Sequence, residues 1–349
     1  MFVRNCWYVA ATAEELKSAE PLGRLLLNEP VVMYRKSDGT PVAMEDRCCH
    51  RRAPLSKGRI EGDSIRCGYH GFLYEPGGKC TWVPGTDRIP SAARVRTYPV
   101  VQKHRWVWIW MGDPALADPA LVPDFRHNDM PGWTATGSLI PVKSNYLYLV
   151  ENLLDLSHVA FLHANTIGSA GDTNPNLDWE RNDHFVRGTR VARDIPPSPR
   201  NRASGITSNL DVTKVMTFYP PCHVTIDISQ IEAGSTPGDS KFRLHSMILN
   251  SMTPETDTTC HYFWGSARDY DLDNAELTRF VLDITTKAFL EDSQMLEAQQ
   301  AIVDLDPSKP TVSVIGDVGA VAATRLVERL LEAERTGAPV RRESTAEPA

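Results

Sequence analysis

Cys48-Cys49-His50 and Cys67-Gly68-Tyr69-His70 are the two stretches that decide the fold of the first part of this chain. Each stretch places a histidine two or three residues after a cysteine, and sixteen residues, 51–66, separate them. Thiolates and neutral imidazoles are ligands for iron–sulfur clusters and for zinc. Two imidazoles on one iron of a two-iron cluster raise its reduction potential well above that of an all-cysteine cluster. The spacing therefore predicts a metal centre built from two Cys/His pairs.

A structural zinc site is the alternative interpretation, because two Cys and two His also satisfy a tetrahedral Zn(II). A zinc finger normally places its second ligand pair on a helix. Here the surroundings are short β-prone runs, such as residues 31–34 and 106–110, separated by glycine-containing turns such as residues 75–78. This context favours a cluster held by two loops of a small all-β domain.

A second constellation lies in residues 152–163, where Asp155, His158 and His163 stand among apolar residues. Burying one carboxylate and two imidazoles is costly unless they have partners, and a metal ion is such a partner. Two imidazoles with one carboxylate form the facial triad of non-haem Fe(II) oxygenases. His158 and His163 are five residues apart, so a regular helix would turn them away from each other. We expect a local irregularity in this helix.

Composition and charge limit the remaining possibilities. The chain has 349 residues, which favours two domains over one. Its net charge is −7 and it has no basic stripe, so we expect no nucleic-acid partner. No apolar run is long enough to cross a bilayer, and we expect no membrane association and a cytoplasmic location. Seven cysteines, an odd number, argue against a complete disulfide framework.

The organisation along the chain follows from these patterns. Residues 1–115 are predicted to form the β domain that holds the first metal site, with a Pro- and Asp-rich connector at residues 114–131. Residues 116–336 are predicted to form an α+β domain with helices at residues 146–163, 274–303 and 318–335. Residues 337–349 have the composition of a flexible tail.

The two constellations, the opening residues 4–10, and residues 253–257 and 261–270 resemble the Rieske-type non-haem iron oxygenases. Within this family the chain is similar to the oxygenase subunits of vanillate O-demethylase and toluenesulfonate methyl-monooxygenase, and more distantly to dicamba O-demethylase. The resemblance implies an N-terminal all-β Rieske [2Fe-2S] domain. It implies that a helix-grip-like α+β catalytic domain with a central antiparallel sheet follows.

The resemblance also implies roles for single residues. Cys48 and Cys67 would hold one iron of the cluster, and His50 and His70 would hold the other. A late helix in the family supplies the carboxylate ligand of the mononuclear iron. The corresponding residue here is Asp292, which joins His158 and His163, and the adjacent Glu291 is the fallback.

Two residues at the start of the second constellation have further implied roles. Asp155 is on the same helical face as His158 and could accept a hydrogen bond from its imidazole. In the family the corresponding Asp also meets a cluster histidine of the next subunit, which would be His70 in a homotrimer. Asn152 is a further candidate beside the iron.

The implied activity is oxidation of a methyl group of a small carboxylated aromatic, with O-demethylation of a methoxybenzoate such as vanillate to a phenol and formaldehyde as the main expectation. O2 and electrons from a separate ferredoxin-type, NAD(P)H-dependent reductase would be needed, and we expect no NAD or flavin bound by this chain. Aromatic methyl hydroxylation, N-demethylation and non-catalytic Rieske electron transfer are the alternatives. Substrate contacts are expected from polar or aromatic residues of the β region, namely Tyr219, His223, His245, Asn250 and Trp264.

Overall fold

The computed structural model describes residues 1–168 and 177–338, which belong to two compact units. Residues 2–122, with 255–257, make one unit, and residues 123–254 with 258–338 make the other. The last helix ends at Thr336, followed by Gly337 in the left-handed conformation with φ 69°. Most of the expected tail, residues 339–349, lies outside the described residues.

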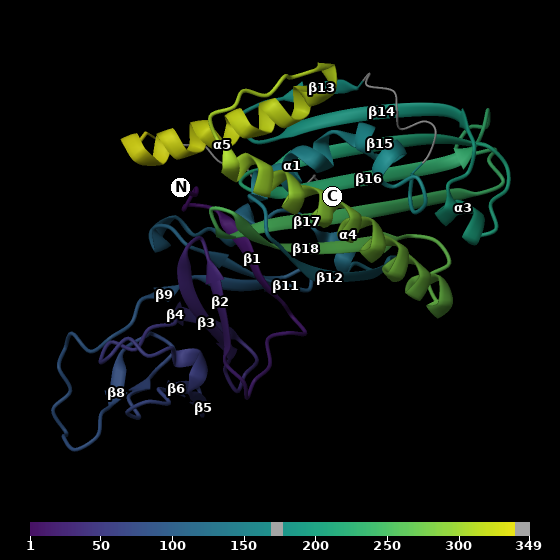
Figure 1. Ribbon diagram of the computed structural model, residues 1–349. Coiled ribbons are helices and arrows are strands. Elements are labelled where there is room, and N and C mark those ends of the chain that lie inside the picture. The colour runs from purple at the N-terminus through teal and green to yellow at the C-terminus, as the bar shows by residue number, and fades with distance from the viewer. Residues whose placement is uncertain (169–176, 339–349) are drawn as a thin grey trace. The chain divides into compact units, whose positions relative to one another are not determined.

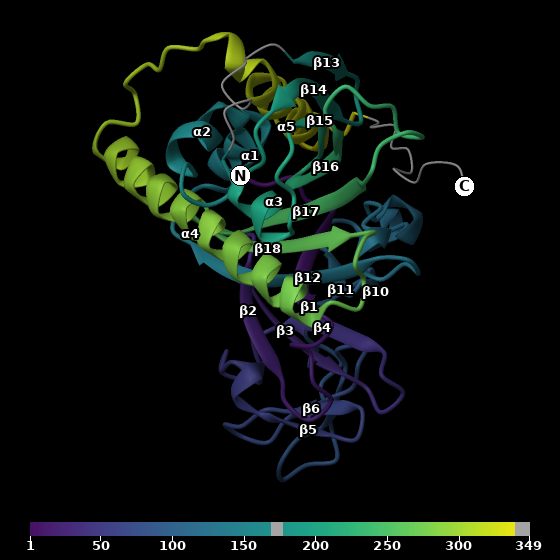
Figure 2. The ribbon, with the colours of Figure 1, turned by 90° about the vertical axis from the view of Figure 1, so that its right-hand side faces the viewer.

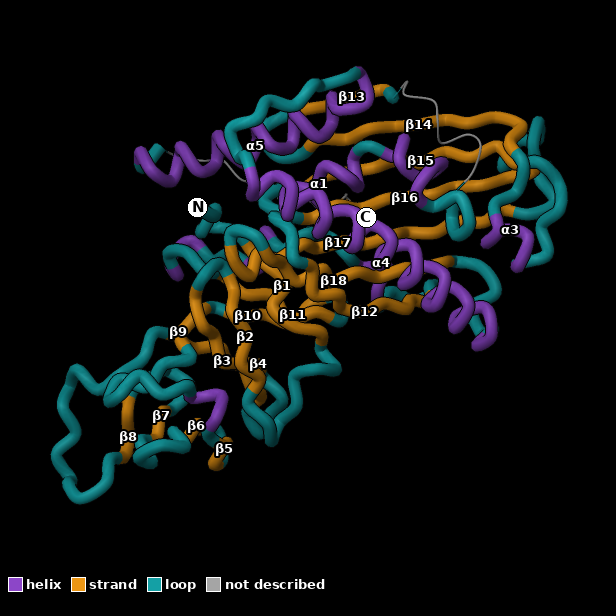
Figure 3. Tube along the Cα trace, viewed as in Figure 1, coloured by secondary structure: helices purple, strands orange, loops and turns teal. Residues whose placement is uncertain are grey.

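The N-terminal unit is built almost entirely of short antiparallel strands in three sheets (Figure 1, purple to blue; Figure 3, orange). The first sheet has the order β1-β11-β10, the second β2-β3-β4-β9 and the third β5-β6-β7-β8. Their bounds are β1 Trp7–Thr12, β2 Leu22–Leu26, β3 Glu29–Arg35, β4 Pro41–Glu45, β5 Arg59–Glu61, β6 Ser64–Arg66, β7 Leu73–Tyr74, β8 Cys80–Trp82, β9 Thr97–Tyr98, β10 Val100–Lys103 and β11 Trp106–Trp110. The expected all-β domain is confirmed.

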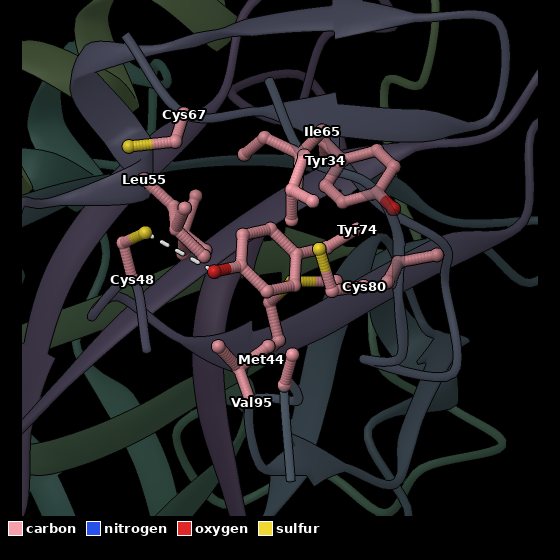
Figure 4. Packing of buried hydrophobic residues seen from close by; sticks show 13 residues of the cluster. Tyr34, Met44, Cys48, Leu55, Ile65, Cys67, Tyr74, Cys80 and Val95 are labelled. Carbon is pink, nitrogen blue, oxygen red and sulfur yellow. Dashed lines mark hydrogen bonds between the residues drawn. The ribbon is translucent and has the colours of Figure 1, made fainter. Parts of the chain in front are cut away.

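The core of this unit explains why the β-prone runs become strands. All five residues of β11 are buried between β1 and β10, and Trp108 and Trp110 are at most 1% exposed. Another core cluster contains Tyr34, Ile65 and Tyr74, and it also includes the two thiols Cys48 and Cys67 (Figure 4). The two metal-binding loops therefore rest directly on a packed core that fixes their positions.

The C-terminal unit contains a seven-stranded antiparallel sheet with the order β12-β18-β17-β16-β15-β14-β13 (Figure 1). The strands are β12 Thr134–Val142, β13 Asp178–Arg181, β14 Val186–Ile195, β15 Leu210–Tyr219, β16 His223–Glu232, β17 Arg243–Thr256 and β18 Thr259–Arg268. The long strands β14 to β18 form successive hairpins, so residues two apart on each strand share one face of the sheet. This alternation decides which side chains reach the site.

The helices of this unit are α1 Tyr146–Leu154, α2 Val159–Leu162, α3 Pro199–Ala203, α4 Ala275–Leu305 and α5 Val318–Thr336. α1 packs against β15 and β16, α4 against β12 and β18, and α5 against β13 and β14 (Figures 1 and 2). α4 and α5 lie where the sequence predicts helices. In the described part of the chain, no helix has the length and apolar character needed to cross a membrane.

Candidate metal centres

The two loops that carry the Cys/His pairs have the same backbone hydrogen-bond pattern. In each loop the cysteine N–H donates to the carbonyl five residues later, over 2.9 Å at Cys48 and 2.8 Å at Cys67. The residue four positions after each cysteine donates back to the cysteine carbonyl from a positive φ, which is 59° at Arg52 and 76° at Gly71. Glycine adopts this conformation at no steric cost, whereas at Arg52 the loop holds a larger side chain in it.

The four predicted ligands come together at the tips of these loops. Cys48 and Cys67 are each 2% exposed, whereas His50 and His70 are exposed. The two imidazole rings lie 4.6 Å apart between centroids, with an angle of 70° between their planes. Two buried sulfurs behind two exposed imidazoles suit a cluster with one sulfur-bound and one histidine-bound iron. The donor set therefore fits the group that the sequence predicts.

The buried thiols have hydrogen-bond donors around them. Burial raises the pKa of Cys67, while the backbone N–H groups of Tyr69 and His70 act in the opposite direction. The hydroxyl of Tyr74 lies 3.1 Å from the sulfur of Cys48 and 3.1 Å from that of Cys49 (Figure 4 shows the first contact). Donors aimed at cluster sulfurs raise the reduction potential because they stabilise the more negative reduced state.

The second constellation gathers in the C-terminal unit as a triad. His158, His163 and Asp292 each offer a ligand atom, and these atoms all lie within 4.8 Å of one another. Nε2 of His163 is 3.1 Å, and Nε2 of His158 is 3.4 Å, from Oδ1 of Asp292. His163 is 1% and Asp292 4% exposed, so these polar groups are buried and need partners inside the protein.

A break in the helix allows His158 and His163 to lie close together although they are five residues apart. α1 ends at Leu154, a 3-10 turn covers Leu156–His158, and α2 begins at Val159. The carboxylate of Asp155 caps this turn by accepting the Ser157 N–H at 2.9 Å. The irregularity that the sequence predicts is confirmed, and it begins before His158.

Hydrogen bonds hold each member of the triad. The backbone carbonyl of Asp155, not its carboxylate, lies 2.6 Å from Nδ1 of His158, which leaves Nε2 for a metal. Asn152 donates to Oδ1 of Asp292 over 3.0 Å. Such partners fix ring orientation and make a ligand more basic.

Glu291 has a role that the sequence did not show. Its carboxylate lies 2.8 Å from Nδ1 of His163 and accepts the Thr166 hydroxyl at 2.9 Å. Burial acts to lower the pKa of His163, but Asp292 and Glu291 outweigh it and raise that pKa. At His158 burial prevails and lowers the pKa. Glu291 thus orients a histidine while its neighbour Asp292 points into the triad.

A cavity of about 120 Å³ lies along one face of the sheet, next to the chain segments that carry the triad. Its wall includes Leu156 and Val159, which flank His158 in the chain, and Phe289, one turn before Asp292 on α4. Strands β14 to β17 add isoleucine, leucine and valine to the wall, namely Ile195, Leu210, Val212, Ile226, Ile228 and Ile248. A dry cavity of about 150 Å³ holds one benzene molecule, so this space suits a single aromatic ring.

None of the five residues that the sequence suggests for substrate contact belongs to the described wall of this cavity. Ser246 and Ile248 of β17 face the cavity, so alternation along β17 sends His245 to the opposite face, where it contacts Asp227 at 2.9 Å. Tyr219 is on that opposite face of β15 by the same alternation. Asn250 is 0% exposed and hydrogen-bonds inside the sheet to Val224 and Tyr262.

The comparisons with known proteins agree with both sites. Residues 6–99 match the Rieske [2Fe-2S] domain, and residues 142–333 match the vanillate O-demethylase oxygenase C-terminal domain. An iron–sulfur subunit of the toluene-4-sulfonate monooxygenase system of Comamonas testosteroni is 38% identical, over 97% of this chain and 99% of that protein. A vanillate O-demethylase oxygenase subunit of Pseudomonas sp. is 34% identical, over 97% of both. The crystal structure of dicamba monooxygenase bound to dicamba has a TM-score of 0.88 at 32% identity, over 96% of this chain and 99% of that one.

A two-iron, two-sulfur domain joined to a domain with an open His/His/Asp site is the architecture of the Rieske non-haem iron oxygenases, and the relatives above are monooxygenases of this class. The chain belongs to this class and, within it, to the family of oxygenase components that includes those of vanillate and dicamba O-demethylases. It combines a Rieske [2Fe-2S] domain with an oxygenase domain in which His158, His163 and Asp292 form a potential mononuclear iron site. This family membership removes the structural zinc interpretation of the Cys/His pairs.

Proposed function

We propose that this chain O-demethylates a small aromatic acid of the methoxybenzoate type, such as vanillate, to a phenol and formaldehyde. One atom of O2 enters a methyl C–H bond, and the resulting hemiacetal breaks its C–O bond to release formaldehyde. The other oxygen atom leaves as water, which consumes two electrons and two protons. The electrons come from NAD(P)H through a separate ferredoxin-type reductase. Bound iron would supply the oxygen chemistry, and Cys48, Cys67, His50 and His70 would hold the cluster that delivers electrons.

The observation that carries this proposal is the cavity whose wall includes Leu156, Val159 and Phe289, which stand close to the triad residues in the chain. His158, His163 and Asp292 would leave coordination positions open, and the wall formed by Leu156, Val159 and strands β14 to β17 would hold a ring beside them. A pure electron carrier needs neither feature. Excluding water from this space would protect the reaction from side products.

The test is turnover with purified reductase, NADH and O2. Demethylation of a methoxybenzoate yields one formaldehyde for each phenol. A methyl hydroxylase, the second possibility raised by the toluene-4-sulfonate relative, would leave a hydroxymethyl group on the ring and release no formaldehyde. Release of a secondary amine with formaldehyde from N-methyl compounds would instead establish N-demethylation. NADH oxidation without any oxidised aromatic would contradict all three activities.

We also propose a homotrimer in which Asp155 meets His70 of the partner subunit. Asp155 and His158 line a second hollow of about 800 Å³ on the C-terminal unit, bordered by the exposed Phe161 and Val312. His70 is itself exposed and free to face another copy. Exposed apolar residues around a polar hollow favour a protein partner there.

Asp155→Asn tests this bridge because asparagine also caps a helix turn and only the charge is lost. We expect the variant to keep its iron and its trimer in analytical ultracentrifugation. Cluster reoxidation after mixing with substrate and O2, followed by stopped-flow absorbance, should be slower by about ten-fold or more. Reoxidation at the wild-type rate, or a monomeric wild-type protein, would exclude the bridging role.

A further inference from the structure

The wall of the cavity is polar and cationic near helix α3, whereas much of the rest is apolar. The polar part includes Ser198, Arg200, Lys214 and Gln230, and no Asp or Glu belongs to the wall in the described ranges. Ile226 and Gln230, both on β16, are four residue steps apart, so the cavity is about 13 Å long along this strand. Figure 1 shows α3 displaced from α1 toward the right-hand end of the sheet. The cationic and polar part of the wall therefore comes from the α3 segment and strands β15 and β16, whereas Leu156 and Val159 come from the segment of His158 and Phe289 from the helix of Asp292.

Arg200 is placed at this end by a well-built local structure. Ser198 and Asn201 form a capping box that fixes the short helix α3. Nη2 of Arg200 donates to Oγ of Ser246 over 3.4 Å, which draws the guanidinium to the sheet. Lys214, Ile228 and Ser246 are direct cross-strand neighbours on β15, β16 and β17, so Lys214 and Ser246 are about 10 Å apart. Two long cationic side chains thus flank one row of the wall.

The charge of Arg200 is not balanced by the protein. Among the residues that the structure describes, no carboxylate lies within ion-pair distance of it, and its polar side-chain contact is the neutral Ser246. The nearby Arg268 adds positive charge, and burial together with the charge of Arg200 lowers the pKa of Arg268. The side-chain NH2 of Gln230 also has no acceptor among the described residues, while its Oε1 accepts from Asn201. Partly buried donors of this kind are stabilised by an anion.

We propose that Arg200, assisted by Lys214 and Gln230, binds the anionic group of the substrate and so points its methyl-bearing end at the triad. The proposal rests on the proposed function, since it concerns the same cavity. The shared chemistry is a planar or tetrahedral oxyanion on an aromatic ring, either a carboxylate or a sulfonate. A guanidinium can hold two oxygens of such a group at once.

The test compares three ligands in iron-loaded, cluster-containing protein: 4-methoxybenzoate, 4-methylbenzenesulfonate and the neutral 4-methylanisole. Dissociation constants are measured anaerobically by calorimetry, and KM and kcat by formaldehyde or hydroxymethyl product. Variants are Arg200→Gln, Arg200→Lys and Arg279→Gln, the last an exposed arginine of α4 outside the cavity wall. Thermal unfolding of each variant checks that the fold is intact.

Arg200→Gln should weaken binding of the preferred anion about 10- to 100-fold, the range of a lost charge-assisted hydrogen bond. Its affinity for 4-methylanisole should stay near the wild-type value, Arg200→Lys should recover part of the loss, and Arg279→Gln should change nothing. The anion with the larger loss identifies carboxylate or sulfonate as the bound group. Equal loss for neutral and anionic ligands, or no loss for either anion, would overturn the proposal. Arg200-dependent anion binding without any methyl oxidation would instead refute the proposed function and leave the subsite standing.

Discussion

Glu291→Gln isolates the contribution of a carboxylate beside the triad that the sequence suggested only as an alternative metal ligand. The Glu291 carboxylate lies 2.8 Å from Nδ1 of His163 and accepts the Thr166 hydroxyl at 2.9 Å. A glutamine fills the same space, and its side-chain oxygen can take the place of Oε2, which faces both partners. What disappears is the negative charge that makes the imidazole of His163 a stronger metal ligand. Changing only this partner should leave the fold unaltered.

The expected effect follows from the kind of hydrogen bond that is lost. A charge-assisted bond is about twice as strong as a neutral one, and the neutral bond remains. Loss of a ligand's carboxylate partner costs about 10- to 100-fold in metal affinity, and the retained bond places this variant near ten-fold, or about 1.4 kcal/mol. Glu291→Ala, which removes both contacts, should approach 100-fold.

Fe(II) affinity is measured anaerobically by competition with a chromophoric chelator, using protein whose cluster content is checked by its spectrum. Asp283→Asn, which removes an exposed acid from the same helix, is the matched control and should bind iron like the wild type. Wild-type affinity in Glu291→Gln would refute the orienting role. Equal weakening in Asp283→Asn would attribute the effect to net charge.

Three further substitutions test the triad, the cluster site and the fold one at a time. Asp292→Ala should abolish iron binding at the triad and turnover, while the cluster's electron paramagnetic resonance signal stays intact; loss of that signal would contradict the separation of the sites. Tyr74→Phe should lower the cluster's reduction potential in protein-film voltammetry because a donor to Cys48 is lost, whereas Tyr34→Phe, in the same core, should not. Gly319→Ala should destabilise the fold by about 1–3 kcal/mol in chemical denaturation, because a Cβ there would lie 1.9 Å from the Trp179 ring. Helix propensity alone predicts about 1 kcal/mol of stabilisation, so the sign of the measured change in unfolding free energy shows which effect prevails.

Helical periodicity predicted α4 well but not what it buries. Met295 and Ile302 fit the apolar pattern, yet they are 54% and 68% exposed. Asp292, Ser293 and Gln300 are buried instead. A periodicity argument assumes that buried positions are apolar, and it fails where a helix face carries ligands. The Cys/His pairs and the two histidines of the triad were predictable from their spacing and residue types, whereas Asp292 followed only from the resemblance to the family.

The residues that line the cavity could not be predicted from the sequence. His245 and Ser246 are neighbours in sequence, yet Ser246 faces the cavity and His245 faces the other side of the sheet. A shift of one residue in a strand reverses every side chain, and the sequence of β17 contains no pattern that fixes this parity. Arg200 belongs to a five-residue helix in a loop region, where no periodicity exists to place it. The contact of Glu291 with His163 was not predictable either, because the two residues are 128 positions apart in the sequence.

The measurement that tests the central claim most directly is metal and acid-labile sulfide analysis of anaerobically purified protein, with an electron paramagnetic resonance spectrum after reduction. Two occupied sites predict about three irons and two sulfides per chain and a Rieske-type signal. Zinc in place of iron, with no labile sulfide, would contradict the account.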